Sequence, residues 1–289
     1  MLEKLAENNN KSPILLTSSI QAELDNPYGR SKKAGEDLIC SYGKENNVST
    51  HIYRLQNVFG KWCKPHYNSA IATFCNNIAS GKDITINDPN ADMKLVYIDD
   101  VVNEFISIFE GNGEGIVTPV HEIKLGEIVK LLYKFKETRK NLSLPNFYDT
   151  FEKKLYSTYL SYLPKDDFSY PLKMNTDERG SFSEFIKTPD RGQVSINVSK
   201  PNITKGNHWH HTKNEKFLVV SGKGVIRFRK PYEDEITEYY VSAEKLEVVD
   251  IPTGYTHNIE NLGEHDMVTV MWANEAFDPE KPDTYFLKV

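Results

Sequence analysis

The chain has 289 residues, more than one hydrophobic core usually organises, so its length predicts two domains. A net charge of -6 and a pI near 5.8 argue against a nucleic-acid partner. No stretch approaches the roughly 20 apolar residues of a membrane helix, and the first residues lack the apolar core of a signal peptide, so we expect a cytoplasmic protein without a membrane span. The three cysteines, Cys40, Cys63 and Cys75, show no CxxC spacing and are expected to be reduced thiols.

Short apolar runs alternate with helical patterns between about residues 12 and 126. The runs Ile14–Leu16 and His51–Leu55 predict buried strands, while Ser31–Tyr42 and Tyr67–Ala79 predict helices. Strands that alternate with helices indicate a parallel α/β sheet. One or two further helices are expected over Gly126–Phe151.

The pattern changes after a region, Leu160–Pro171, that has no clear periodicity and is predicted to be a linker. Many short apolar runs separated by Gly, Pro or Asn follow it, which predicts an all-β barrel or sandwich. The predicted strands are Gln193–Lys200, Lys216–Val220, Gly224–Arg229, Glu235–Val241, Leu246–Ile251 and Met267–Trp272.

Four residues of the metal-ligating types stand in two short motifs of this β region. His208 and His210 alternate along a strand and therefore share a face, and Glu215 and His257 complete a set that suits Zn, Fe, Mn or Ni. The motifs resemble those of the metal-binding cupins, HxHxxxxE and PxGxxHxxxN. The glycine that often opens the second motif is replaced here by Leu246.

A second resemblance concerns the stretch Asp177–Glu184, which is similar to the DxRGxFxE signature of dTDP-4-keto-6-deoxyhexose 3,5-epimerases. It implies that Arg179 grips a nucleotide diphosphate and that Glu184 and Lys205 lie on the substrate side. It also implies that His208 is the base that removes a sugar proton, whereas the cupin resemblance makes His208 a metal ligand. The groups that could move the proton are His208, Lys205, Tyr255 and His211.

The α/β region contains the residue types of a carbonyl reduction site. Ser19 ends the first strand, and Tyr28 and Lys32 follow with YxxxK spacing, which places an ammonium one helical turn from a phenol. Together with Asn57 in RLQNVFG and the stretch Tyr97–Val101, this resembles the extended short-chain dehydrogenase/reductases that act on nucleotide sugars. The resemblance implies a catalytic Ser19, Tyr28 and Lys32 and a substrate-binding Asn57.

The glycine-rich GxxGxxG loop, through which that family binds NAD(P), occurs nowhere in the sequence. The early strands of the reductase, about 100 residues by family resemblance and the usual length of βα units, are expected to be missing. We therefore expect an α/β remnant of a Rossmann-like extended short-chain reductase over residues 1–163, followed by a cupin (jelly-roll) barrel over residues 170–289. NADPH binding by this chain alone is expected to be lost.

The order of the two regions resembles the bifunctional capsular polysaccharide biosynthesis enzymes of the UDP-N-acetyl-L-fucosamine pathway. The resemblance implies a zinc cupin that epimerises a UDP-4-keto-6-deoxy-N-acetylhexosamine at C3, a reductase that uses NADPH on the 4-ketone, and a homodimer. Two other functions stay open: a non-catalytic cupin subunit for dimerisation or binding, and a metal-dependent dioxygenase.

Overall fold

The computed structural model describes all residues from 1 to 289. The chain forms two units. One contains Met1–Lys136 and Pro145–Phe168, and the other contains Glu137–Leu144 and Ser169–Val289. None of the helices combines the length and apolar character needed to cross a membrane.

The first unit contains the α/β elements that the sequence predicts, with ends shifted by a few residues; the helix predicted over Tyr67–Ala79, for example, begins at Ala70. The helix predicted over Ser31–Tyr42 begins earlier because the Asn26 side chain accepts the backbone N–H of Gly29 and Pro27 occupies the first helical position. The elements of this unit are α1 (Leu2–Glu7), β1 (Ile14–Ser19), η1 (Ile20–Glu23), α2 (Pro27–Asn46), β2 (Thr50–Leu55), β3 (Asn57–Phe59), α3 (Ala70–Ala79), β4 (Asp92–Tyr97), α4 (Ile98–Phe109), β5 (His121–Lys124), α5 (Leu125–Asn141, which ends in the second unit) and α6 (Thr150–Leu160).

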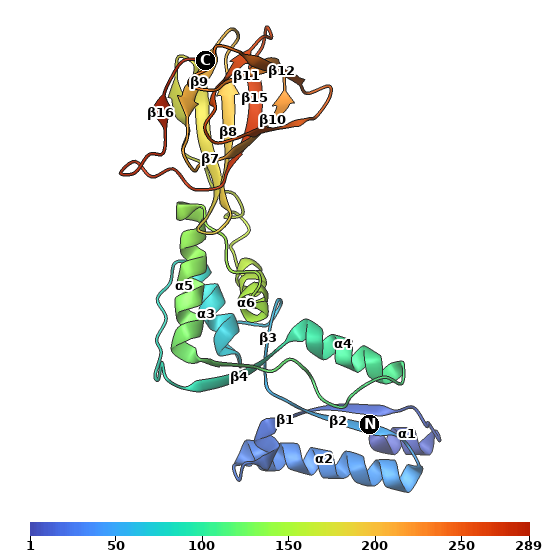
Figure 1. Ribbon diagram of the computed structural model, residues 1–289. Helices are drawn as coiled ribbons and strands as arrows, with labels where there is room; N and C mark the ends of the chain where they lie inside the picture. The colour runs from blue at the N-terminus through green and yellow to red at the C-terminus, as the bar shows by residue number, and fades with distance from the viewer. The chain divides into compact units, whose positions relative to one another are not determined.

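The expectation of one parallel sheet is only partly correct for this unit. β1 pairs with β2 in parallel, and β3 pairs with β4 in parallel, but the two pairs form separate sheets. β5 joins β4 in antiparallel orientation. α2 packs along the β1–β2 sheet (Figure 1), where Ile39 and Tyr42 contact Ile14 and Val48 in a small core.

The second unit is a two-sheet β-barrel, drawn in yellow to red in Figure 1. One sheet has the order β13-β10-β15-β8-β7-β6 and the other the order β12-β11-β14-β9-β16. The predicted fold class, an α/β region followed by an all-β cupin barrel, is confirmed. The strands are β6 (Asn175–Asp177), β7 (Gly180–Thr188), β8 (Gly192–Ser199), β9 (Thr204–Trp209), β10 (Glu215–Ser221), β11 (Lys223–Arg229), β12 (Thr237–Ser242), β13 (Val248–Ile251), β14 (Thr256–Asn261), β15 (Met267–Ala273) and β16 (Tyr285–Phe286).

Polar and apolar side chains alternate along β8 in the reverse of the usual sense, in which the apolar side chains are the buried ones. Apart from Gly192, its buried positions are polar, and its half-buried positions are Val194, Ile196 and Val198. These three pair with Trp272, Val270 and Val268 of β15, and directly opposed residues of an antiparallel pair share a face. The six-stranded sheet therefore presents an apolar stripe outward. The buried polar residues of β8 are Gln193, Ser195, Asn197 and Ser199.

All six strands predicted for this unit are present, with ends shifted by a few residues. The turn before β13 closes without the motif glycine: Leu246 is exposed, and Ser242 and Lys245 form a bridge. β7 and β14 were not predicted from periodicity, because polar side chains occupy several of their buried positions, among them Ser181, Ser183, His257, Asn258 and Asn261.

Candidate metal centre and a second cleft

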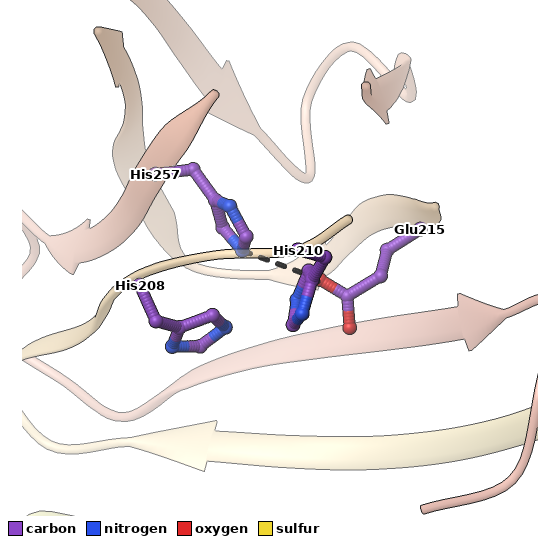
Figure 2. Close-up of side chains that lie close together, drawn as sticks. All are labelled: His208, His210, Glu215 and His257. Atoms are coloured by element: carbon purple, nitrogen blue, oxygen red, sulfur yellow. Dashed lines mark ion pairs between the residues drawn. The ribbon is translucent and has the colours of Figure 1, made fainter. Parts of the chain in front are cut away.

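Three strands of the barrel bring together four side chains of the types that bind metal ions. His208 of β9 and His257 of β14 are direct cross-strand neighbours, so their side chains share a face. His210 follows the end of β9, and Glu215 begins β10. In Figure 2 these four side chains point toward one another.

The distances within the cluster are short. One ligand atom from each of the four residues lies within 4.8 Å of the others. Oε2 of Glu215 lies 3.5 Å from Nε2 of His210 and 3.2 Å from Nε2 of His257. Two ligands bound about 2.1 Å from one tetrahedral ion are separated by about 3.4 Å, so these two separations fit a shared zinc ion.

Burial supports the same conclusion for three of the four residues. Nε2 of His210, Oε2 of Glu215 and Nε2 of His257 are buried and have no hydrogen-bond partner. Buried polar atoms of this kind are costly unless a partner satisfies them. Two imidazole nitrogens and a carboxylate oxygen that converge in this way fit a divalent cation such as zinc.

The backbone fixes which nitrogen of His210 faces the cluster. Nδ1 of His210 contacts the carbonyl oxygen of Asp283, and because a carbonyl only accepts, Nδ1 carries the proton. The Nε2 lone pair of His210 is therefore directed to the cluster. Nδ1 of His257 lies 3.4 Å from the carbonyl oxygen of Tyr255, a longer contact of the same type.

Two side chains of the cluster, His208 and Glu215, have displaced pKa values. Burial, followed by repulsion from His257 and His210, lowers the pKa of His208 to about 4. Burial by itself would raise the pKa of Glu215, but electrostatic attraction to the neighbouring imidazoles of His210 and His257 outweighs it and lowers that pKa to about 2. His208 is thus neutral and Glu215 ionised near pH 7.

A cavity of about 430 Å³ opens beside the cluster. Its lining includes His208, Arg179 and Lys205. Nζ of Lys205 donates to Oδ1 of Asn197 at 2.9 Å and to the carbonyl oxygen of Val198 at 2.8 Å. Burial lowers the pKa of Lys205. The cavity therefore combines three residues of the cluster, His208, Glu215 and His257, with two cationic side chains.

The other residues predicted for this site are placed differently. Nε and Nη2 of Arg179 donate to the Asp177 carboxylate at 2.9 and 2.5 Å, at the rim of the cavity. Glu184 forms an ion pair with Lys187 at 2.6 Å and is not part of the cavity lining. Tyr255 and His211 are also absent from the lining, and the ring of His211 lies against Trp209 and Tyr285.

A second cleft, of about 630 Å³, lies in the first unit and brings together the predicted reductase residues. Ser19, Tyr28, Lys32 and Asn57 all line it. Nζ of Lys32 lies 5.7 Å from the centre of the Tyr28 ring and donates to the carbonyl oxygen of Thr17 at 3.5 Å. The Ser19 hydroxyl accepts the backbone N–H of Gln21 at 3.2 Å, which holds it at the start of η1.

Sequence reasoning missed two residues that organise the barrel site. Asn197, which accepts from Lys205, belongs to the polar face of β8 and could have been found from that period-2 polar pattern. Asp283 gave no signal, because it lies far along the chain from both motifs. Burial by itself would raise the pKa of the Asp283 carboxyl, but backbone N–H donors from the loop after His210 outweigh it and lower that pKa.

Comparisons with known proteins agree with both units. Residues 7–117 match the NAD dependent epimerase/dehydratase family, and residues 175–285 match the polysaccharide biosynthesis C-terminal domain. The UDP-2-acetamido-2,6-beta-L-arabino-hexul-4-ose reductase of Pseudomonas aeruginosa is 45% identical over 293 residues, which cover 100% of this chain and 79% of the relative. The crystal structure of the capsular polysaccharide assembling protein CapF from Staphylococcus aureus is 64% identical and superimposes with a TM-score of 0.97, over 100% of this chain and 81% of the other. The chain therefore belongs to the family of these two proteins, in which an epimerase/dehydratase-type α/β domain precedes a polysaccharide biosynthesis C-terminal barrel.

Proposed function

We propose that this chain modifies a nucleotide sugar for capsular polysaccharide synthesis, and that its barrel is a zinc-dependent epimerase acting at C3 of a UDP-4-keto-6-deoxy-N-acetylhexosamine. The observation that carries the proposal is the buried cluster of His210, Glu215 and His257. Glu215 and His257 also line a cavity whose other lining residues include His208, Lys205 and Arg179. The names of the two relatives, one a UDP-sugar reductase and one a capsular polysaccharide assembling protein, support the substrate class.

We assign three residues to the metal and His208 to the proton. A buried nitrogen or oxygen atom without a hydrogen-bond partner is present in each of His210, Glu215 and His257. Neither ring nitrogen of His208 is both buried and without a partner. Catalytic zinc sites usually have three protein ligands and an open fourth position. When bound there, the cation stabilises negative charge on the oxygen of a ketone.

The residues of the cavity then perform the epimerisation. The neutral His208 imidazole removes the C3 proton, which is acidified by the adjacent 4-ketone. Lys205 returns a proton to the opposite face of C3. It is the remaining acid/base group of the lining, because the others are proposed ligands or belong to the Asp177–Arg179 pair. Arg179 binds the diphosphate through its planar guanidinium fork.

Exchange of the C3 proton with deuterated solvent tests this assignment. The metal-loaded protein should incorporate deuterium into the 4-keto sugar, and His208→Asn should slow the exchange by about 100-fold or more while zinc content is unchanged. Loss of zinc together with exchange would place His208 among the ligands instead. A zinc-loaded wild-type protein that exchanges no proton would favour a non-catalytic barrel.

We also propose that the chain forms a homodimer through the barrel. The outward apolar stripe on β8 and β15, formed by Val194, Ile196, Val198 and their partners on β15, supports this, because monomeric surfaces rarely expose a continuous apolar strand pair. A second copy related by a two-fold axis is the proposed occupant, because it would cover the stripe with the same stripe of its own. Val270→Glu should shift the sedimentation of the protein from dimer to monomer.

For the α/β region, we propose residues 1–163 as a reductase-type domain whose cleft holds Ser19, Tyr28, Lys32 and Asn57 around a carbonyl substrate. The 289 residues contain no glycine-rich GxxGxxG turn, the element that holds a dinucleotide pyrophosphate in this fold. NADPH-dependent reduction is therefore not expected from this polypeptide tested by itself. Residues 170–289 form the second proposed domain.

A further inference from the structure

The segment after β15 returns to the metal centre at Asp283. Besides the contact between its carbonyl oxygen and Nδ1 of His210, its carboxylate accepts three consecutive backbone N–H groups. These come from His211 at 2.9 Å, Thr212 at 2.7 Å and Lys213 at 2.9 Å. The Thr212 hydroxyl adds a fourth hydrogen bond at 3.1 Å.

These contacts restrain the part of the site that has no strand to hold it. His210 and Glu215 are separated by residues 211–214, which lie between β9 and β10 and belong to neither. Restraining such a loop ahead of binding spares part of the ordering cost when a ligand binds. The carboxylate of Asp283 fixes the loop, and its carbonyl oxygen fixes the ring of His210 in the tautomer that exposes Nε2.

No other residue outside the two motifs reaches both parts of the site. Nδ1 of His257 has only the 3.4 Å contact with the carbonyl oxygen of Tyr255, which belongs to the same motif. Asn274 assists at the far end of the loop, where its side chain accepts the backbone N–H of Asn214 at 3.1 Å. The segment that follows β15 is thus tied to the loop at both ends.

We propose that Asp283 is a positioning residue of the metal centre: it sets the affinity of the site by holding His210 and the loop to Glu215, so that docking of the C-terminal segment and metal binding are coupled. The proposal rests on the proposed metal site.

Zinc affinity, measured by competition with a chromophoric chelator, tests the coupling. Asp283→Ala should weaken zinc binding by about 10- to 100-fold, the usual effect of removing a group that orients a metal ligand. Asp283→Asn should show a smaller loss. Asp278→Ala is the matched control, because the Asp278 side chain in the same segment bonds only the nearby backbone N–H of Glu280, and its affinity should equal that of the wild type.

Two readouts separate positioning from general stability. Cobalt(II) bound to the wild type should give the intense visible bands of a four-coordinate ion, and the bands should shift and weaken in Asp283→Ala. Ring ¹⁵N spectra of the metal-free proteins should show the Nδ1–H form of His210 in the wild type and a mixture of tautomers in the variant. If Asp283→Ala is unfolded, Thr212→Val, which removes only one hydrogen bond, should still weaken zinc binding measurably.

The failures are distinguishable. A folded Asp283→Ala that binds zinc as tightly as the wild type, with unchanged cobalt bands, overturns the positioning role while the metal site stands. A wild-type protein that binds neither zinc nor cobalt overturns the proposed function itself.

Discussion

Glu215 is the residue on which the barrel site depends most. It is the only carboxylate in the cluster, and it lies within 3.5 Å of two imidazoles that have no other partner at Nε2. A buried carboxylate leaves one negative charge without a full counter-charge, which a divalent cation supplies.

The first prediction at this scale concerns the ligand set. His257→Ala should reduce zinc from about one ion per chain to almost none, because two protein ligands rarely retain zinc. His211→Ala is the control, since the His211 ring packs on Trp209 and Tyr285 rather than in the cluster, and it should keep its zinc. Metal analysis of the purified variants decides the question, and full zinc in His257→Ala would remove His257 from the set.

A second residue-scale prediction concerns Glu36 in the first unit. Its carboxylate is buried and accepts hydrogen bonds from Nε and Nη2 of Arg54 at 2.8 and 2.6 Å and from the Ser18 hydroxyl at 2.6 Å. The hydrogen bonds from Arg54, with a smaller contribution from Ser18, outweigh burial and lower the pKa of Glu36 from 4.5 to about 2. Because the folded pKa is depressed, the ionised carboxylate stabilises the unit fully above pH 4.5, and the stabilisation is lost as the pH falls toward 2.

Glu36→Gln should therefore lower the free energy of unfolding by about 3 kcal/mol at pH 7, since it leaves Arg54 without its buried partner. The difference from wild type should shrink steadily below pH 4.5. Glu23→Gln removes an exposed carboxylate from the same Arg54 and should leave the free energy of unfolding nearly unchanged. Urea unfolding at several pH values measures both, and a pH-independent difference would contradict the assignment.

At the scale of elements, the start of helix α2, next to the reductase-type cleft, packs closely on the backbone that precedes it. A Cβ at Gly29 would lie 2.3 Å from the carbonyl oxygens of Gln21 and Leu24, whereas a Cβ at Gly35 would meet nothing within 4 Å. Gly29→Ala should thus destabilise the unit by about 2 kcal/mol and displace the neighbouring Tyr28. Gly35→Ala should stabilise it by about 0.5–1 kcal/mol through helix propensity. Urea midpoints that move in the same direction would contradict this packing.

The elements also show what periodicity predicts and what it misses. α2 and β1 carry apolar residues at regular helix and strand spacing and were predicted, although caps set their true ends. β14 was recognised only through its motif, because its buried side chains include His257 and Asn258. The four candidate ligands of the barrel site could be predicted from local spacing. The contact of Asp283 with His210 and His211 joins residues about 70 positions apart in the chain, and no local pattern predicts it.

At the scale of the whole molecule, the two units divide the chemistry unequally. The barrel brings together within itself the proposed ligands, the proposed base and a cavity. The α/β unit brings together Ser19, Tyr28 and Lys32, yet the chain has no glycine-rich turn to hold a pyrophosphate. Positioning of the nicotinamide against the carbonyl carbon supplies much of the rate of hydride transfer. We therefore expect that Ser19, Tyr28 and Lys32, although they suit the proton transfer, do not suffice for NADPH-dependent reduction without that anchor.

The last prediction follows from this division. The 289-residue polypeptide should show no saturable NADPH binding by nicotinamide fluorescence at micromolar concentrations, and no oxidation of NADPH when the 4-keto sugar is added. The same preparation should exchange the C3 proton with solvent, because that reaction needs only the barrel, and this exchange shows that the sample is folded and loaded with zinc. Tyr28→Phe should change neither result, whereas His208→Asn should stop the exchange alone. Saturable binding with substrate-dependent oxidation of NADPH, abolished by Tyr28→Phe, would show that residues of this chain other than a glycine-rich turn hold the cofactor.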